Sequence, residues 1–344
     1  MSHLLEVNHL KVSFATRDKE LEAVRDVSFH VDEGETLAIV GESGSGKSVT
    51  ARSLIGMFSS PNGRIRSGEI RFEGRVISGL SAKAMRRIRG SEISMVFQDP
   101  MSSLNPTMKI GIQIGEGLRK HRKLSPKDAR ARSIELLNLV GIPDAPSRYH
   151  QYPHEFSGGM RQRVAIAMAL ACDPKLLIAD EPTTALDVTI QAQILDILSS
   201  LQQQTGSSIL LITHDLGVVA EVAHRVAVMY AGTIVETGTV EDIFDRPRHP
   251  YTWGLLQSTP RLDDTEHDRL IPIEGSPPDI AALPPGCPFA DRCPYTMDIC
   301  LTEMPDATLF SPKHSARCWL NDPRAPQVDD RIPAERNEHD QIYN

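Results

Sequence analysis

Residues 41–48 read Gly-Glu-Ser-Gly-Ser-Gly-Lys-Ser and have the spacing G-x-x-x-x-G-K-[ST] of a phosphate-binding loop. Glycines let such a loop curl until its backbone N–H groups point inward, and the following helix adds partial positive charge at its N-terminus. Lys47 supplies a full charge, and the Ser48 hydroxyl is placed to ligate the Mg²⁺ that accompanies a nucleotide. The spacing therefore predicts a triphosphate site formed by Gly41, Ser43, Gly44, Ser45, Gly46, Lys47, Ser48 and Val49.

Two elements must hold this loop in place. The apolar residues 36–40 before it predict a buried strand, and residues 49–57 after it have helical character. A strand that leads through a glycine turn into a helix forms an anion site. Because both neighbours are present, we interpret the match as functional.

Two carboxylates end a second buried strand. Residues 175–180 form an apolar run that ends in Asp180, and Glu181 follows. Ligands bind at the carboxyl ends of the strands in open α/β sheets. Asp180 can therefore hold the Mg²⁺ shell, and Glu181 can orient and deprotonate an attacking water. Taken alone, the pair also fits a strand end that is capped by solvated acids.

A second anion cradle lies between these two motifs. Ser157, Gly158 and Gly159 precede a predicted helix, where backbone N–H groups and a hydroxyl can bind phosphate. One ATP molecule does not need two cradles in one chain.

Composition excludes several classes of protein. The chain has 344 residues, enough for one large domain or two ordinary ones, and its net charge is -8. It lacks the clustered basic face of a sequence-independent DNA-binding protein, so we expect no nucleic-acid partner. Neither a signal peptide nor an apolar run of the roughly 18 to 20 residues of a spanning helix is present in the sequence. We expect a cytosolic protein, whose membrane role would come through a partner.

The hydrophobic pattern predicts an α/β fold with a helical insertion. Residues 4–34 alternate apolar and polar positions around a charged turn, which is typical of antiparallel strands. Further strands are expected over residues 91–97, 175–180 and 208–214, and helices over about 110–172, with proline breaks, and 189–204. After residue 238 the pattern decays into a proline-rich extension.

The order of the motifs resembles that of the ATP-binding subunits of ABC transporters. The resemblance covers residues 4–240 and includes the phosphate loop, Gln98 in Phe-Gln-Asp-Pro, Ser157-Gly158-Gly159, Asp180-Glu181, Asp187 in Ala-Leu-Asp, and His214. Phe156 and Met160 depart from the family signature, which has leucine and glutamine there. The resemblance implies a P-loop NTPase core of the ABC ATPase type, with an antiparallel β subdomain, a helical insertion and a cysteine-bearing C-terminal extension.

The resemblance also implies roles for single residues. Gln98 would sense magnesium and water next to the membrane subunit, and His214 would contact the γ-phosphate. Lys47 and Glu181 complete the catalytic set, and Asp187 belongs to the nucleotide-binding set. Phe14 would stack on adenine, with a core phenylalanine at a strand end as the alternative. In this family two such domains pair head to tail, and each signature motif closes over the nucleotide of the partner.

A narrower resemblance is to the oligopeptide and dipeptide importer branch, on residues 101–106, residues 248–252 and the cysteine-bearing tail. It implies an ATPase at the cytoplasmic face of the inner membrane that powers import of short peptides. Its partners would be a second ABC ATPase in a heterodimer, two polytopic membrane subunits and an extracytoplasmic solute-binding protein. Import of nickel, glutathione or another small solute is the alternative within the branch. A soluble ABC ATPase that acts on nucleic acid or ribosomes is the alternative outside it.

Four of the five cysteines, Cys287, Cys293, Cys300 and Cys318, lie near the C-terminus. In a reducing compartment such a group suggests a metal before a disulfide, and four thiolates suit Zn²⁺ or an iron-sulfur cluster. The resemblance implies a [4Fe-4S] cluster, which we favour over Zn²⁺, and reduced unbound cysteines are the third possibility. We expect His314 at the surface.

The expected domains follow from these patterns. Residues 1–240 form the ABC ATPase domain, with a helical subdomain over about 99–170. Residues 241–320 form the C-terminal extension with the four cysteines, and residues 321–344 form a disordered tail. Because the extension is too small for its own core and lies outside the phosphate and magnesium motifs, we expect its role to be structural.

Overall fold

The N-terminal strands form a four-stranded antiparallel sheet in the order β2-β1-β4-β5. In the computed structural model, which describes residues 3–16, 19–58, 60–99, 103–184, 187–259 and 272–328, these strands are β1 (Leu5–Ala15), β2 (Glu20–Val31), β4 (Gly63–Phe72) and β5 (Arg75–Val76). Alternate apolar residues of β1 are buried, as the sequence predicts for residues 4–34. The strands β4 and β5 and the helix α2 (Ala82–Ile88) were not predicted; in β4 only Ile70 and Phe72 are buried, so its apolar pattern is weak.

The second sheet has eight strands in the order β11-β12-β10-β9-β3-β8-β7-β6. They are β3 (Thr36–Val40), β6 (Ile93–Val96), β7 (Leu176–Asp180), β8 (Ser208–Thr213), β9 (Arg225–Tyr230), β10 (Thr233–Thr239), β11 (Thr308–Leu309) and β12 (Ser315–Ala316). The predicted strands β3, β6, β7 and β8 are parallel, with β9 also parallel to β3. Alternate residues of β3 enter two different core clusters, Leu37 and Ile39 on one face and Ala38 and Val40 on the other. Burial on both faces explains why these strands are apolar throughout.

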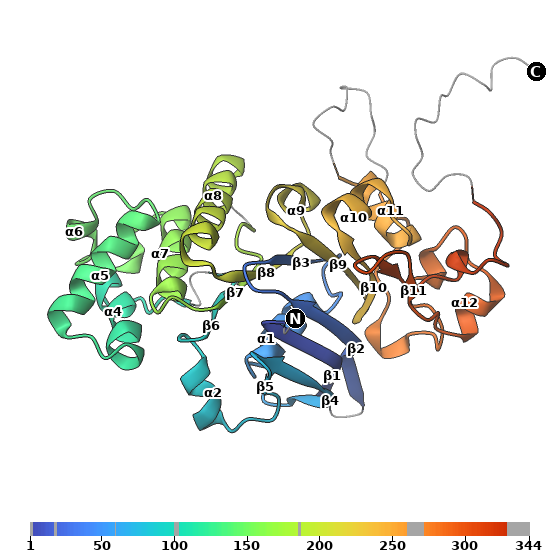
Figure 1. The fold of residues 1–344 in the computed structure, drawn as a ribbon, viewed down its shortest axis with the longest axis horizontal. Coiled ribbons are helices and arrows are strands. Elements are labelled where there is room, and N and C mark those ends of the chain that lie inside the picture. The colour runs from blue at the N-terminus through green and yellow to red at the C-terminus, as the bar shows by residue number, and fades with distance from the viewer. Residues whose placement is uncertain are drawn as a thin grey trace, which may run out of the picture.

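The predicted helical insertion is present at one end of this sheet (Figure 1). It contains α4 (Ile110–His121), α5 (Pro126–Leu139), α6 (Ala145–Arg148), the 3-10 turn η1 (Pro153–Glu155) and α7 (Gly158–Leu170). The expected break at Pro126 is the start of α5, where Ser125 accepts a hydrogen bond from Asp128 N. Helices α1 (Lys47–Leu54), α8 (Val188–Thr205) and α9 (Leu216–Val222) pack on the sheet.

The C-terminal extension lies at the opposite end of the molecule (Figure 1). Its elements are α10 (Val240–Asp245), α11 (Pro250–Gln257), η2 (Ile280–Ala282), η3 (Ala290–Arg292), α12 (Asp298–Thr302) and η4 (Trp319–Asn321). Through β12, which pairs with β10, the extension adds two short strands to the main sheet. Cys287, Phe289 and Cys300 belong to the same core cluster as Ala38 and Val40 of β3. The extension therefore shares the core of the main sheet.

One prediction about the extension is wrong. His314 is buried rather than exposed, and its Nε2 donates to Glu236 Oε1 at 2.9 Å. Glu236 on β10 is itself buried and also accepts hydrogen bonds from Arg248 N, His249 N and the Thr252 hydroxyl. A buried carboxylate needs several donors, and the extension supplies all four of these.

Two further expectations concern membrane spans and the tail. The described helices include none with the length and apolar character that crossing a membrane requires. Residues 329–344, which make up most of the predicted disordered tail, lie outside the described residues, as do residues 100–102 and Ala185-Leu186.

Candidate active site

The predicted phosphate loop joins the end of β3 to the start of α1. Gly41, Gly44 and Gly46 have φ angles of 152°, 80° and 101°, a region that favours glycine. A Cβ on Gly41 would lie 2.1 Å from Met229 O, and one on Gly46 would lie 2.5 Å from Ala23 O. The loop therefore requires glycine at these two positions both for its backbone conformation and for its packing.

Lys47 lies inside the loop. Its side chain is buried, and Nζ donates to the carbonyl oxygens of Gly41 at 2.7 Å and Glu42 at 2.9 Å. Burial lowers the pKa of Lys47, and the nearby carboxylates of Glu181, Asp180 and Glu42 act in the opposite direction. The loop thus holds a cation where the sequence predicts phosphate.

Two of the three predicted Mg²⁺ ligands contact one another. The Ser48 hydroxyl donates to Asp180 Oδ1 at 2.7 Å, although 132 residues separate the two in the chain. Burial raises the pKa of Asp180, while its bonds to Ser48 and to Arg52, whose Nη2 lies 3.3 Å from Oδ2, lower it. These two oxygens are hard ligands of the type that Mg²⁺ prefers.

Glu181 stands at the meeting point of three strand ends. Its carboxylate accepts a hydrogen bond from Gln98 Nε2 at 2.7 Å, after β6, and Oε1 lies 3.5 Å from His214 Nδ1, after β8. Its backbone has φ of 49°, and its N–H donates to Ile212 O. The Thr184 hydroxyl donates to the same carboxylate at 2.9 Å. Thr184 and Arg52 were missed in the sequence, although both lie within a turn of a recognised motif.

The structure does not bring the second anion cradle to this site. Ser157 and Gly158 are exposed at the start of α7, where the Ser157 hydroxyl accepts from Met160 N at 3.3 Å. Figure 1 shows α7 with the helical insertion, apart from α1. Gly159 faces Ile190 of α8, and Asp187 caps α8 by accepting from Ile190 N at 2.9 Å.

Phe14 has a less distinctive position. It lies near the end of β1, partly buried, opposite Gly63 of β4. A Cβ on Gly63 would lie 2.7 Å from Phe14 Cε1 and 2.9 Å from Phe58 Cβ, so the ring is packed against this glycine. The adenine contact stays a prediction.

Comparison with known proteins agrees with this geometry. The ABC transporter family model matches residues 24–184, and the model of the oligopeptide/dipeptide transporter C-terminal region matches residues 235–300. The oligopeptide transport ATP-binding protein OppD of Bacillus subtilis is 58% identical over 329 residues, which cover 96% of this chain and 92% of that protein. The chain belongs to the family of oligopeptide and dipeptide transport ATP-binding proteins.

Other relatives agree with the family assignment. The dipeptide transport ATP-binding protein DppD of B. subtilis is 56% identical, with 94% of this chain and 97% of that protein covered. Among solved structures, the ATP-binding cassette MJ0796, a dimer bound to ADP and Pi, matches with a TM-score of 0.62 and 25% identity over 69% of this chain and 98% of that one. The chain is therefore an ABC ATPase, and ATP with Mg²⁺ is the ligand set that fits its core.

The four C-terminal cysteines of this ABC ATPase line one small cavity, together with His249, Phe289 and other residues of the extension. Burial raises the pKa of Cys287 to about 11 and that of Cys318 to about 12, and it also raises the pKa of Cys293. Backbone groups of nearby residues act in the opposite direction and lower these pKa values: those of Phe289 and Ala290 for Cys287, that of Tyr295 for Cys293, and that of Leu320 for Cys318. Cys172, the fifth cysteine, is buried elsewhere in the core.

His249 contributes an unusual group to this cavity. Its side chain is 1% exposed, and Nδ1 accepts a hydrogen bond from Tyr251 N at 3.0 Å. Burial lowers the pKa of His249 to about 3 and keeps the ring neutral, so the ring carries one proton. Because Nδ1 is an acceptor, that proton is on Nε2. That Nε2–H is buried and has no hydrogen-bond partner among the described residues.

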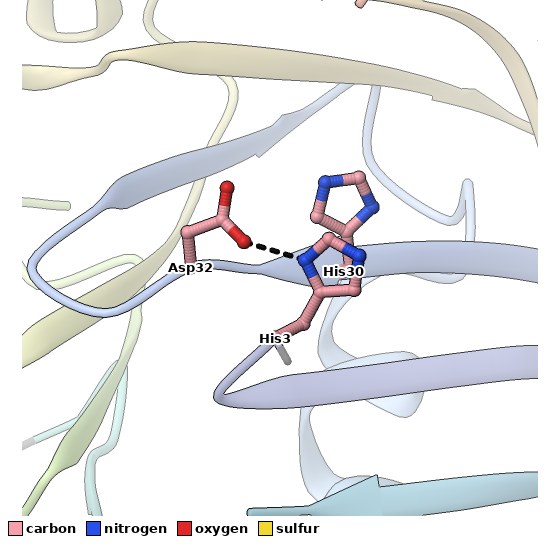
Figure 2. A group of neighbouring side chains, drawn as sticks. All are labelled: His3, His30 and Asp32. Carbon is pink, nitrogen blue, oxygen red and sulfur yellow. Dashed lines mark hydrogen bonds and ion pairs between the residues drawn. The ribbon is translucent and has the colours of Figure 1, made fainter. Parts of the chain in front are cut away.

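A second group of metal-ligating side chains lies at the edge of the N-terminal sheet. Figure 2 shows His3, His30 and Asp32 close together, with His3 Nδ1 donating to Asp32 Oδ1 at 2.5 Å. Among the described residues this is the one group of three or more such side chains whose ligand atoms lie within 4.8 Å of one another. Arg225 donates to His30 Nε2 at 3.1 Å, so a guanidinium occupies a ligand position and disfavours a cation there. The same search covers the four cysteines of the cavity described above. No three of their sulfurs lie within 4.8 Å of one another.

Proposed function

We propose that this chain is the ATP-hydrolysing subunit of an importer of short peptides. It works at the cytoplasmic face of the cell membrane, in a heterodimer with a second ABC ATPase. Two polytopic membrane subunits and an extracytoplasmic solute-binding protein complete the transporter. The observation that carries the proposal is similarity along nearly the whole chain to relatives named as oligopeptide and dipeptide transport ATP-binding proteins.

The contacts around Glu181 support a role for each predicted catalytic residue. Glu181 is the general base, and the hydrogen bonds from Gln98 and Thr184 orient its carboxylate toward an attacking water. Lys47 and the loop N–H groups bind the β- and γ-phosphates, and His214 contacts the γ-phosphate from the end of β8. Ser48, Asp180 and Gln98 hold Mg²⁺, which neutralises charge on the transferring phosphoryl group.

The exposed position of Ser157 and Gly158 supports a site shared between two subunits. These residues, with Gly159 and Asp187, serve the nucleotide that is bound by the partner ATPase. Catalysis at one phosphate loop then depends on the other subunit, since positioning and charge neutralisation supply nearly all of the rate in phosphoryl transfer.

Reconstitution tests this function. The purified chain alone should hydrolyse ATP slowly, and addition of the partner ATPase with the membrane subunits should restore turnover. The peptide-loaded binding protein should stimulate that turnover further, whereas the same protein loaded with nickel or glutathione should not. Full activity of the monomer, independent of its concentration, would contradict the shared site.

We further propose that Cys287, Cys293, Cys300 and Cys318 hold one [4Fe-4S] cluster. All four cysteines line one cavity, and the unpartnered Nε2–H of His249 in the same cavity suits a sulfur acceptor. In a tetrahedral zinc site with Zn–S bonds of about 2.3 Å the sulfurs lie roughly 3.8 Å apart. No three of these four sulfurs lie within 4.8 Å of one another, so the arrangement suits a group larger than one zinc ion.

Anaerobic purification tests this assignment. The protein should be brown, with a broad absorption band near roughly 400 nm and about four irons per chain. Replacing any of the four cysteines with serine should reduce the iron content and loosen residues 275–320, as measured by hydrogen exchange. Cys172→Ala is the matched control, because this buried cysteine lies outside the cavity. Colourless protein that carries stoichiometric zinc would instead identify the metal as Zn²⁺.

A further inference from the structure

Glu42 is an acid inside a loop that binds a highly charged anion. It is the second residue of the phosphate loop, and its side chain is 26% exposed. A carboxylate this close to a triphosphate would repel it unless a cation compensates the charge. In this chain the cation comes from the C-terminal extension.

Arg292 forms a bidentate ion pair with the Glu42 carboxylate through both terminal nitrogens of its guanidinium. Nη1 lies 2.6 Å from Oε2 and Nη2 lies 3.1 Å from Oε1, although 250 residues separate the two in the chain. Arg292 is 5% exposed, and its planar group matches the carboxylate in a bidentate pair. Its Nε donates to Glu274 O at 2.8 Å, and it lies over the ring of Phe289. The guanidinium is thus held in one orientation by the extension itself.

Tyr251 makes a second contact to the same loop residue. Its hydroxyl accepts a hydrogen bond from Glu42 N at 2.7 Å, and its ring is fully buried against Tyr230 and Phe289. With Lys47 donating to the carbonyl oxygen, Glu42 is held at its N–H, its C=O and its carboxylate. Two of these three contacts come from the extension. The extension thus contacts the phosphate loop in space, although its residues lie outside the phosphate motif in the sequence.

Both residues that contact Glu42 are close in sequence to residues that line the cysteine cavity. Arg292 directly precedes Cys293, and Tyr251 is two residues after His249, which lines the same cavity. A change that loosens the wall of this cavity would therefore also release the phosphate loop.

We propose that Arg292 and Tyr251 are positioning residues for ATP binding, through which the folded C-terminal extension controls the phosphate loop. Arg292 neutralises the Glu42 carboxylate, and Tyr251 fixes the first turn of the loop. The proposal goes beyond the transport function, since it rests on ATP binding by this chain and on neither the transported solute nor the metal held by the cysteines.

Equilibrium binding of a fluorescent ATP analogue to the full chain tests the role of Arg292. Arg292→Gln should weaken binding about ten-fold or more, because it leaves a carboxylate uncompensated beside the phosphates. The double variant with Glu42→Gln should recover to within about three-fold of the wild type, since the repelling charge is then gone. Arg324→Gln is the control, because Arg324 forms an exposed ion pair with Asp322, just after the end of the extension. A double variant as weak as Arg292→Gln would overturn the electrostatic role.

For Tyr251 we expect a loss of ATP binding that Glu42→Gln does not rescue. Tyr251→Phe keeps the ring but removes the acceptor of the Glu42 N–H, so ATP binding should weaken by about three-fold to ten-fold. Glu42→Gln should not restore this loss, since the backbone N–H is unchanged. Rescue by Glu42→Gln, or unchanged binding in Tyr251→Phe, would overturn the proposed role of Tyr251.

A reciprocal measurement covers the case in which the Arg292 variant fails to fold. If the extension favours ATP binding, then ATP must stabilise the extension by the same free energy. Hydrogen exchange of residues 273–292 should therefore slow when ATP binds to the wild type, and this slowing should be smaller in Glu42→Gln, in which only the Tyr251 contact remains. Exchange that is unaffected by ATP in the wild type would overturn the coupling, and it would leave the transport function untouched.

Discussion

The chain contains two glycine-containing helix starts that can bind phosphate, and they are built differently. The phosphate loop is closed on itself: Lys47 is buried within it, and Ser48 contacts Asp180 from β7. The start of α7 is open: Ser157 and Gly158 are exposed, and the Ser157 hydroxyl caps its own helix. Similar local sequence therefore makes a complete cradle in one place and an exposed helix start in the other.

This difference has a physical cause in the surroundings of each loop. Around Gly41 and Gly46 the backbones of β9 and β2 approach so closely that a Cβ has no room. Around Gly158 a Cβ would meet nothing within 4 Å. The start of α7 therefore leaves room for the second ATPase of the dimer proposed above.

The largest expected effect is at the closed site, in Glu181→Gln. The amide keeps the size of the carboxylate but accepts no proton from water, so turnover of the assembled transporter should fall by about 10² to 10⁴. ATP affinity should be unchanged, and the closed dimer should persist. Phosphate release and nucleotide binding measure the two quantities. Glu221→Gln, an exposed position on α9, is the control, and wild-type hydrolysis by Glu181→Gln would reject the role.

Lys47→Ala should damage binding rather than turnover alone. It removes the buried cation from the cradle, so affinity for ATP should fall by about 10-fold to 100-fold, as for a lost hydrogen bond to a charged group. Isothermal titration of the full chain measures this loss. Lys83→Ala on the exposed side of α2 should have no effect. If Lys47→Ala bound ATP as the wild type does, the closed cradle would not be the nucleotide site.

Gly158→Ala separates the open site from the closed one. The isolated chain should keep its stability and its ATP affinity, since the methyl group meets no atom of this chain. In the closed dimer the methyl would stand against the nucleotide of the partner, and hydrolysis there should fall by about ten-fold. Gly117→Ala in α4, with Cys172 Sγ at 3.9 Å as its nearest neighbour, is the matched control. If the two variants were equally active, Gly158 would not face the nucleotide of a partner subunit.

The smallest expected effect is on the helix that faces α7. Asp187→Ala removes the cap that accepts from Ile190 N at the start of α8, which should cost about 1 kcal/mol in the free energy of unfolding. Urea unfolding of the isolated chain measures this cost. Asp196→Ala, eight residues into the same helix, should change stability by less, and an equal cost would argue against capping.

Local sequence was sufficient for the closed site. A strand, a glycine turn and a helix follow one another along the chain, and the α/β pattern brings the ends of β3, β6, β7 and β8 to one edge. The side chains of Gln98, Asp180, Glu181 and His214 could therefore be expected near the phosphate loop. Each of them directly follows or ends a buried apolar run, which is a signal that single-sequence reasoning detects well.

Only the tertiary structure decided how the extension is attached. The burial of His314, the pairing of β12 with β10 and the two contacts to Glu42 join residues that are 78 to 250 positions apart. No periodic pattern encodes such pairs, because polar side chains in an irregular, proline-rich segment look solvated until their partners are known. The sequence by itself determined the nucleotide fold and its catalytic edge, since these depend on continuous apolar strands and on a loop of fixed spacing. The tertiary structure determined that the cysteine-bearing extension shares the core and contacts the phosphate loop, since a buried ion pair depends on where two distant segments meet.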